Sequence, residues 1–205
     1  MEKVDYKKTF KHLYHASDKK VSYVDVPEMK YIQIEGKGSP EGSDFHQSIE
    51  VLYKMAYTLK FMFKDKSLQP DNYHDYVVPP LEALWCMDGE TFDVSKPDEW
   101  KWISMILQPD FINESHVKLA TELIRKKKEV AGLKKLKLAK RNEGKAVQMM
   151  HIGPYNEVGK VYIIMERELK EKDLKASGAA HEIYLSDPRR VANEKLKTIA
   201  RMTYR

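Results

Sequence analysis

The sequence switches between the two hydrophobic periodicities of regular secondary structure, and the order of the switches is the same in both halves of the chain. Alternation with period two predicts a strand, and apolar residues three or four positions apart predict a helix. Each half gives the order strand, helix, strand, strand, with different spacings. We therefore expect an α+β fold. It is a duplicated strand-helix-strand-strand repeat with pseudo-twofold symmetry, whose antiparallel sheets carry helices on one side and a ligand cleft on the other.

The first repeat occupies residues 21–112. Its helix has an apolar stripe that includes Phe45, Ile49 and Leu52, and either Ser43 or Asp44 can cap it. The Gly36-Lys-Gly38-Ser-Pro40 segment predicts a turn before the helix. The expected elements are a strand pair at 21–26 and 29–35, a helix at 43–63, and a second strand pair at 76–86 and 100–107.

The second repeat occupies residues 145–205. Gly153-Pro154 and Asp187-Pro188 mark its turns. The expected elements are a strand at 145–152, a helix at 156–172, and strands at 180–186 and 196–204.

Two segments lie outside the repeats. Residues 113–144 are a polar linker, in which 113–141 predicts a long helix, or two, interrupted at Gly132. Residues 1–20 predict an N-terminal helical extension that packs loosely on the body, because Tyr6, Phe10, Leu13 and Tyr14 recur at helical spacing.

The net charge of +5 is concentrated in the linker. Residues 125–141 contain nine Lys or Arg and one acid, Glu129, a local net charge of +8 that leaves −3 for the other residues. A basic face binds phosphates by releasing counterions, but this segment has no interleaved aromatic residues to stack on bases. The pattern favours a solvated helix face and does not favour nucleic acid as a partner.

Several function classes find no support in the sequence. No apolar run is long enough to cross a membrane, and the start resembles no secretory signal. A single cysteine, Cys86, suits a reducing cytoplasm and excludes a disulfide scaffold; we expect it to be a small core residue. His12 and His15 share a helical face but have no third ligand nearby, so we expect no metal. Gly36 and Gly38 lack the third glycine of a dinucleotide-binding loop, and we expect no cofactor.

Alternation points to an acidic site on the strand at 180–186. If Ile183 and Leu185 face the helix, then Glu182 and Tyr184 face the cleft. Glu is seldom fully buried without a partner, and desolvation raises the pKa of a carboxyl toward the range useful for proton transfer. The alternative is an ion pair between Glu182 and a basic residue of a neighbouring strand.

The same reasoning applies to three tryptophans. If Ile103 and Met105 face the core, Trp100 and Trp102 lie on the cleft side. Aromatic rings are also common on half-buried strands. Trp85, Trp100 and Trp102 are therefore either cleft residues or core residues.

Five segments carry a resemblance to a known family, and it spans about residues 21–205. The most specific are His-Ile-Gly-Pro-Tyr at 151–155 and His-Glu-Ile-Tyr-Leu-Ser-Asp-Pro at 181–188, supported by 29–38, 76–85 and 100–106. They resemble the GyrI-like small-molecule-binding domain of the SOUL/GyrI superfamily. The stand-alone bacterial branch that is similar to cyclopropanoid cyclopropyl hydrolases is the nearest.

The resemblance implies a function and a set of site residues. The function is a cofactor-independent detoxifying hydrolase that opens the cyclopropane of DNA-alkylating aromatic compounds by hydration. The alternative is a non-catalytic module that sequesters or senses lipophilic, often cationic, drugs; a third is association with gyrase or nucleic acid through 125–141. The first 20 residues are too few for the DNA-binding module of the sensor relatives. The acidic position that matches the family is Glu182. The expected catalytic residues are Glu182 as general base and Tyr155 as hydrogen-bond donor, with Tyr184 as the alternative donor, and the expected substrate contacts are Tyr184, Trp85, Trp102, Trp100, Tyr31, His151 and Glu82.

Overall fold

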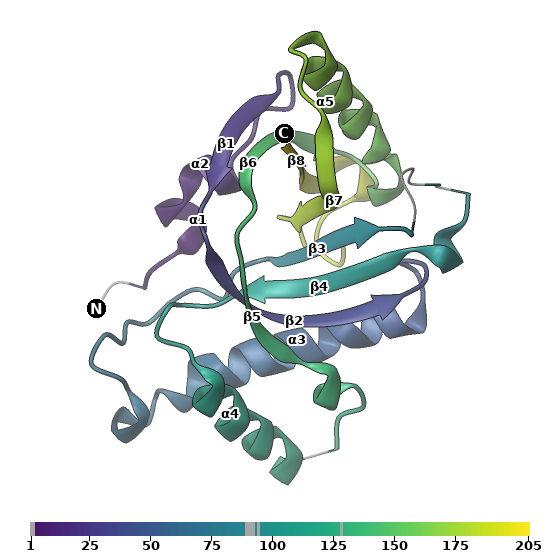
Figure 1. The fold of residues 1–205 in the computed structure, drawn as a ribbon. Helices are drawn as coiled ribbons and strands as arrows, with labels where there is room; N and C mark the ends of the chain where they lie inside the picture. Colours follow the sequence, from purple (N-terminus) through teal and green to yellow (C-terminus); the bar gives the residue numbers. More distant parts are fainter. Residues whose placement is uncertain (1–2, 89–92, 94, 128) are drawn as a thin grey trace.

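An eight-stranded sheet with antiparallel strand pairs forms the centre of the fold (Figure 1). The structure is a computed structural model that describes residues 3–88, 93, 95–127 and 129–205. The strand order is β1-β6-β8-β7-β3-β4-β2-β5. The strands are β1 Ser22–Val26, β2 Met29–Lys37, β3 Leu81–Cys86, β4 Lys101–Leu107, β5 Lys137–Arg141, β6 Gly144–Ile152, β7 Ala176–Tyr184 and β8 Lys197–Tyr204.

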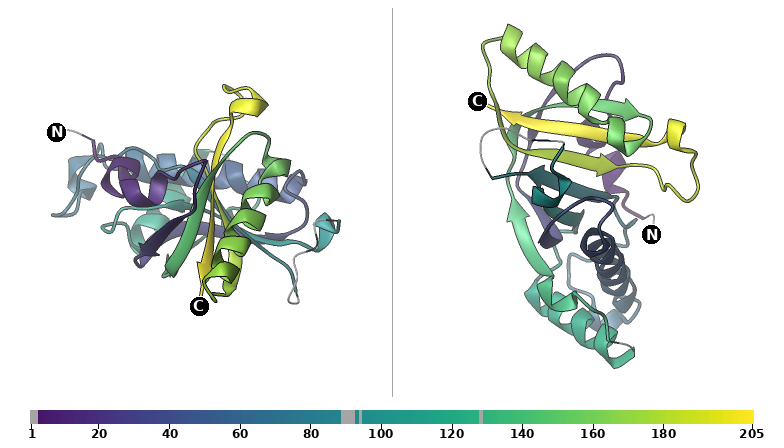
Figure 2. Two further views of the ribbon diagram at one scale, coloured as in Figure 1. Left: turned by 90° about the horizontal axis from the view of Figure 1, so that it is seen from above. Right: turned by 90° about the vertical axis from the view of Figure 1, so that its right-hand side faces the viewer.

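Two long helices pack on this sheet (Figures 1 and 2). Helix α3 covers the half made of β2, β3 and β4, and α5 covers the half made of β6 and β8. The helices are α1 Tyr6–Thr9, α2 Lys11–Tyr14, α3 Ser43–Met62, α4 Glu114–Lys127 and α5 Gly159–Glu171. Within the described part of the chain, no helix is long and apolar enough to cross a membrane.

The predicted duplication is confirmed. The first repeat is β2-α3-β3-β4 and the second is β6-α5-β7-β8, and the repeats join where β3 pairs with β7. Ala83 of β3 lies opposite Glu182 of β7 in this central pair. The strand that carries the candidate acid is therefore at the junction between the repeats.

The strand that precedes each repeat pairs with the other repeat. Strand β1 lies beside β6, and β5 lies beside β2. The predicted pairing of residues 21–26 with 29–35 is therefore wrong, although both strands exist. The connection Pro27-Glu28 has neither the Gly nor the Asn of a tight hairpin, and Pro27 lacks a backbone donor.

The linker contains less helix than predicted. Helix α4 ends at Lys127, Gly132 has a left-handed φ of 81°, and β5 pairs with β2. The predicted helix to residue 141 is wrong, because the backbone of β5 forms its hydrogen bonds with β2 at the edge of the sheet. Lys137 and Lys140 lie on this edge strand, where charge discourages pairing with another chain.

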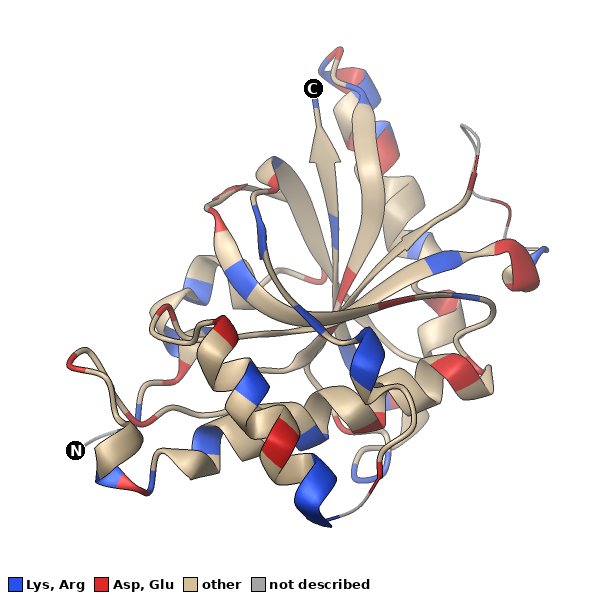
Figure 3. Cartoon of the chain, turned by 60° about the horizontal axis from the view of Figure 1, so that its bottom comes forward, with Lys and Arg blue, Asp and Glu red and all other residues tan. Residues whose placement is uncertain are grey.

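The basic segment 125–141 is exposed along most of its described length. Figure 3 shows Lys and Arg gathered at the C-terminal end of α4. On β5, Lys137 and Lys140 form ion pairs with Glu35 and Glu28, at 3.8 and 2.8 Å. The segment is solvated, but it is part helix and part strand.

The strand predicted at 76–86 is shorter than expected. Strand β3 starts at Leu81, after Pro79 and Pro80. Proline cannot donate to the strand ladder. Tyr76 instead makes an isolated parallel bridge with Val4.

The N-terminal extension is firmly packed, which corrects the expectation of loose docking. Leu13 and Tyr14 are buried on the face of the sheet opposite α3 and α5. Two carbonyls of α2 are held by the sheet: Gln148 Nε2 donates to His12 O at 2.8 Å, and Arg201 Nη2 donates to Leu13 O at 2.7 Å. The N-terminal extension therefore contributes Leu13, Tyr14 and Ala16 to the core.

Candidate functional site

Glu182 and Tyr184 lie on the face of the sheet that carries α3 and α5, not on the opposite face as predicted. Ala200, the cross-strand neighbour of Glu182, packs under α5, and Tyr184 packs against the core beneath α3. Ile183 and Leu185 belong to the opposite face, which the short helix α2 contacts but neither long helix covers. We call it the helix-free face because α3 and α5 are both on the other side. Alternation predicted that Glu182 and Tyr184 share one face, but it cannot decide which face the helices cover, because a one-residue shift exchanges the two.

The tryptophans are on the same helix-bearing face. Trp85 and Trp102 are buried, with ring centroids 4.8 and 5.2 Å from that of Phe45 on α3. The prediction that Trp102 lies away from the helix is wrong for the same reason: alternation does not show which face of the strand the helix covers. Gly36 lies opposite Trp102 on β2, and a Cβ there would be 2.2 Å from the indole, so only glycine fits.

Trp100 lies just before β4 and is half-buried. Its ring meets that of Trp85 edge-on at 5.9 Å, and its Nε1 donates to Asp93 O at 2.9 Å. Trp85 thus connects Trp100 with the centre of the sheet.

Three side chains form a hydrogen-bonded series that ends on Glu182. Trp85 Nε1 donates to Tyr184 Oη at 3.2 Å, and Tyr184 Oη donates to Glu182 Oε2 at 2.8 Å. The Tyr155 ring lies edge-on to Tyr184, with centroids 5.3 Å apart. The structure therefore brings together four of the predicted site residues.

Glu182 ionises at a higher pH than an ordinary glutamate side chain. Burial raises its pKa to about 7, while the Tyr184 hydrogen bond and the nearby His181 charge act in the opposite direction. Burial and Asp187 raise the pKa of Tyr155, so its hydroxyl remains protonated at neutral pH. Glu182 can accept a proton near pH 7 and Tyr155 can donate a hydrogen bond.

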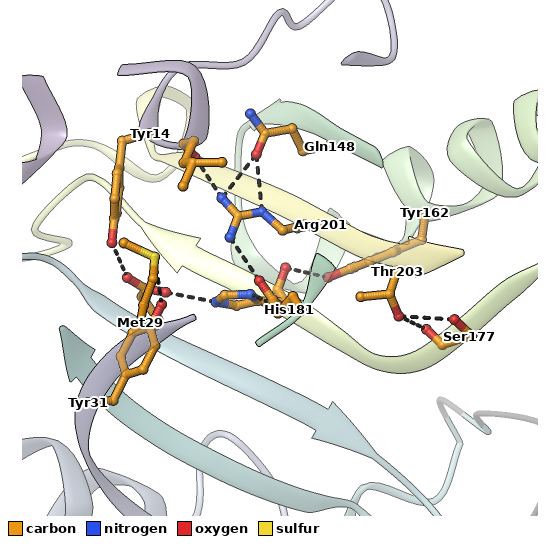
Figure 4. A network of polar contacts seen from close by, with 12 residues as sticks. Tyr14, Met29, Tyr31, Gln148, Tyr162, Ser177, His181, Arg201 and Thr203 are labelled. Atoms are coloured by element: carbon orange, nitrogen blue, oxygen red, sulfur yellow. Dashed lines mark hydrogen bonds and ion pairs between the residues drawn. The ribbon is translucent and has the colours of Figure 1, made fainter. Parts of the chain in front are cut away.

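Glu82 and Tyr31, two of the predicted substrate contacts, lie on the helix-free face in a buried network (Figure 4). Glu82 is fully buried and accepts from Tyr14 Oη at 2.6 Å and from His181 Nε2 at 2.9 Å. Burial, followed by the charge of Glu82, raises the pKa of both Tyr14 and Tyr31. These residues are not brought together with Glu182.

The network continues through a second carboxylate. Glu143 accepts from His181 Nδ1 at 2.7 Å and from Arg201 Nη1 at 3.0 Å. Burial alone would lower the pKa of His181, but Glu143 and Glu82 raise it to about 9. Burial opposes ionisation of Glu143, yet His181 and Arg201 lower its pKa to about 2. His181 and Glu143 are therefore both charged at neutral pH.

The model of the GyrI-like small-molecule-binding domain matches residues 19–201. This chain belongs to the GyrI-like family. The match includes both repeats and the residues around Glu182, and it leaves out most of the N-terminal extension.

Solved structures agree with the assignment to the GyrI-like family. A conserved protein from Listeria innocua is 40% identical, with a TM-score of 0.91, over 99% of this chain and 100% of that one. A hydrolase from Listeria innocua is 38% identical, with a TM-score of 0.87, over the same shares. The C-terminal domain of EcmrR, 11% identical with a TM-score of 0.56 over 91% of this chain and 97% of that one, shares the fold. Among curated proteins, no sequence matches this chain.

Two tyrosines near the candidate site were missed in the sequence. Tyr162 of α5 donates to His181 O at 3.0 Å, and burial followed by Glu182 raises its pKa. Tyr53 of α3 is half-buried and lies close enough to Tyr155 to raise the pKa of that residue. Each tyrosine directly follows a buried residue of its helix, Leu52 or Val161. A helical projection of the sequence would place both tyrosines at the border of the apolar stripe.

The remaining predicted residues lie elsewhere. His151, near the end of β6, is buried, and its Nε2 lies 2.8 Å from Pro154 O, where it supports the Gly153-Pro154 turn. Cys86 is exposed at the end of β3, so its prediction as a core residue is wrong: its side chain points to the helix-free face, where no helix covers it. Among the described residues, no group of three His, Cys, Asp or Glu could hold a metal ion.

Proposed function

We propose that this GyrI-like protein is a cofactor-independent hydrolase that hydrates a strained ring in a flat aromatic substrate. The observation that carries the proposal is the pKa of Glu182, raised to about 7 by burial. A carboxyl with this pKa exchanges protons near neutral pH, whereas a fixed counter-charge for a cation would need to remain ionised. The similarity to a hydrolase from Listeria innocua supports the same reaction class.

The substrate we propose is an aromatic compound whose cyclopropane is conjugated to a carbonyl, as in DNA-alkylating agents. It would lie against the tyrosines near Glu182, where each ring pair contributes about 0.5–1.5 kcal/mol beyond burial. Tyr155 and Tyr184 are both half-buried and so offer part of their ring surface. Trp85 supports them from beneath through its bond to Tyr184.

The reaction is the addition of one water. Glu182 takes a proton from the water, the water oxygen bonds to the ring carbon, and the strained carbon–carbon bond breaks. The electron pair moves onto the conjugated carbonyl oxygen, which later takes up a proton. General-base assistance is worth roughly 10²–10⁴-fold in rate.

The developing oxyanion needs a hydrogen-bond donor. Tyr184 already donates to Glu182 at 2.8 Å, whereas Tyr155 has only a long bond of 3.4 Å to Ser186 O. The sequence left the choice between these two tyrosines open. We assign the role of donor to Tyr155 because its hydroxyl is less committed.

The test is to incubate the protein with such a cyclopropane compound and follow the hydrated, ring-opened product by mass spectrometry. Glu182→Gln should lose roughly 10²–10⁴-fold in rate. Glu166→Gln, an exposed acid on α5, should turn over like the parent. Equal rates for Glu182→Gln and the parent would remove Glu182 from the chemistry.

Binding without turnover by the parent would reject the hydrolase and support the sequestering module. A titration with a lipophilic cationic dye, followed by tryptophan fluorescence, then examines that alternative. Cation–π contacts of about 0.5–2 kcal/mol each would hold such a dye. Its affinity should fall in Glu182→Gln only if the charge of Glu182 is needed.

A further inference from the structure

A hollow of about 330 Å³ opens on the helix-free face of the sheet, away from the Glu182 site. This volume lies in the range of small-molecule sites. Leu84 and Ile103, which are cross-strand neighbours on β3 and β4, provide apolar surface. The polar part of the wall includes Cys86, Arg141, Asn142 and Glu143. The buried layer of the N-terminal extension, which contains Leu13 and Tyr14, contributes no wall residue to it.

The backbone around the hollow is irregular on one side. The pairing of β7 with β8 shifts register between Ser177, which lies opposite Thr203, and His181, which lies opposite Arg201, so the ladder is irregular there. Gly178 within this irregular stretch has a φ of 73°, and a Cβ there would be 2.8 Å from Thr203 Oγ1. Ser177 and Thr203 hydroxyls lie 3.2 Å apart and fix this wall (Figure 4). Irregular strand pairing, as in β-bulges, is over-represented next to binding and active sites.

The polar wall offers donors and one uncompensated positive charge. Both oxygens of Glu143 are occupied, by His181 and by Arg201. Arg141 donates from Nε to Gln33 Oε1 at 2.9 Å, and in the described part of the chain it forms no ion pair. A guanidinium has five N–H donors in a planar fork that matches a carboxylate, so four N–H groups of Arg141 remain for a ligand.

We propose that this hollow is a second ligand site, which binds a small organic acid. Its carboxylate pairs with the guanidinium of Arg141, and its apolar body lies on Leu84 and Ile103. The site is separate from the proposed hydrolase chemistry, because Glu182 is on the other face of the sheet.

Cys86 supplies a direct measurement. It is the only cysteine of the chain, it is exposed, and it lines the hollow. We would measure the rate at which neutral N-ethylmaleimide labels it, with benzoate or benzamide added at constant ionic strength. Benzoate at ten times its dissociation constant leaves about one tenth of the protein free, so labelling should slow about tenfold. Uncharged benzamide should slow it far less.

Variants separate Arg141 from general charge effects. Arg141→Gln should abolish the protection by benzoate. Lys140→Gln should preserve it, because Lys140 is on the same strand but exposed and paired with Glu28. Equal protection by benzoate and benzamide, no protection by either, or full protection in Arg141→Gln would each overturn the proposal.

A second measurement needs no variant. Methyl resonances of Leu84 and Ile103 in the parent should shift on addition of benzoate and should not shift with benzamide. Unmoved methyl resonances at benzoate concentrations that slow labelling would also overturn the proposal. Loss of ring-opening activity in the Glu182 experiment would leave these results unchanged, so the two proposals fail separately.

Discussion

His181 and Glu182 are neighbours on β7, yet they meet opposite environments on the two faces of the sheet. On the helix-free face, two carboxylates raise the pKa of His181 to about 9. On the helix-bearing face, burial raises the pKa of Glu182 to about 7, and one tyrosine donates to it. Both side chains lose solvent, but only His181 gains partners of opposite charge.

The comparison shows that burial alone does not decide whether a group stays charged. Glu143 is held charged, with its pKa lowered to about 2, because His181 and Arg201 both donate to it. The helix-free network is therefore a paired set of charges that secures the N-terminal extension. Among the residues that the structure describes, Glu182 forms no ion pair, which costs stability and leaves its carboxyl able to take up a proton near pH 7. Each prediction below alters one side of this contrast.

The largest effect is expected from Arg201→Met, which breaks the helix-free network. Arg201 is almost fully buried and binds Glu143, Gln148 and the Leu13 carbonyl. Its removal takes one of two cationic partners from buried Glu143, which keeps His181, and leaves Gln148 and the Leu13 carbonyl without their donor. The free energy of unfolding in urea should therefore fall by about 3–5 kcal/mol.

The matched control for this measurement is Arg167→Met. Arg167 forms an exposed ion pair with Glu171 at 3.8 Å, and its loss should change the free energy of unfolding by less than about 1 kcal/mol. Similar values for the two variants would mean that the buried network does not stabilise the fold.

A smaller effect of opposite sign is expected from Glu182→Gln. The folded-state pKa of about 7 exceeds the ordinary value of 4.5, so the folded protein binds this proton more tightly than the unfolded chain does. This contribution to stability is complete below pH 4.5 and declines as the pH rises through 7. The variant lacks the decline, and at pH 8 it should be more stable than the parent by about 1–3 kcal/mol.

Urea unfolding at pH 4, 6 and 8 measures the difference between Glu182→Gln and the parent. The difference should grow with pH, whereas Glu166→Gln, with its exposed side chain, should show a flat profile. A difference that shrinks as the pH rises would show that Glu182 is stabilised in its charged form.

The smallest effect is expected from Tyr184→Phe. The Tyr184 hydroxyl donates to the charged form of Glu182, and this bond lowers the pKa of the carboxyl. Without it, the midpoint of Glu182 titration should rise by up to about one pH unit. Carbon-13 NMR of labelled glutamate, with Glu182→Gln to assign the signal, measures the midpoint.

Tyr57→Phe is the control for the tyrosine experiment, because Tyr57 is exposed on α3. It should leave the Glu182 midpoint unchanged. A midpoint that stays constant or falls in Tyr184→Phe would show that the tyrosine does not support the ionised carboxyl.

Local patterns predicted much of this molecule. The apolar stripe of Phe45, Ile49 and Leu52 lies in α3, and alternation placed Glu182 and Tyr184 on one face of one strand. These predictions succeeded because they depend on residues that are close in sequence, and the periods of helix and strand differ clearly.

The remaining features depend on pairing between distant parts of the chain. Residues 137–141 were predicted as helix, but they form strand β5. This strand is stabilised by its pairing with β2, which lies far away in the sequence. The partners of His181 come from Glu82 and Glu143, 99 and 38 residues away. Sequence periodicity carries no information about such partners.

The sequence by itself determined the order of elements within each repeat, the duplication, and the placement of an acid and a tyrosine on one face of β7. Only the tertiary structure decided that this pair faces α3 and α5 and that its neighbour His181 faces a paired network. The physical reason is that a strand has two faces related by a shift of one residue. The layers that cover each face, which come from distant segments, fix the charge of the side chains beneath them.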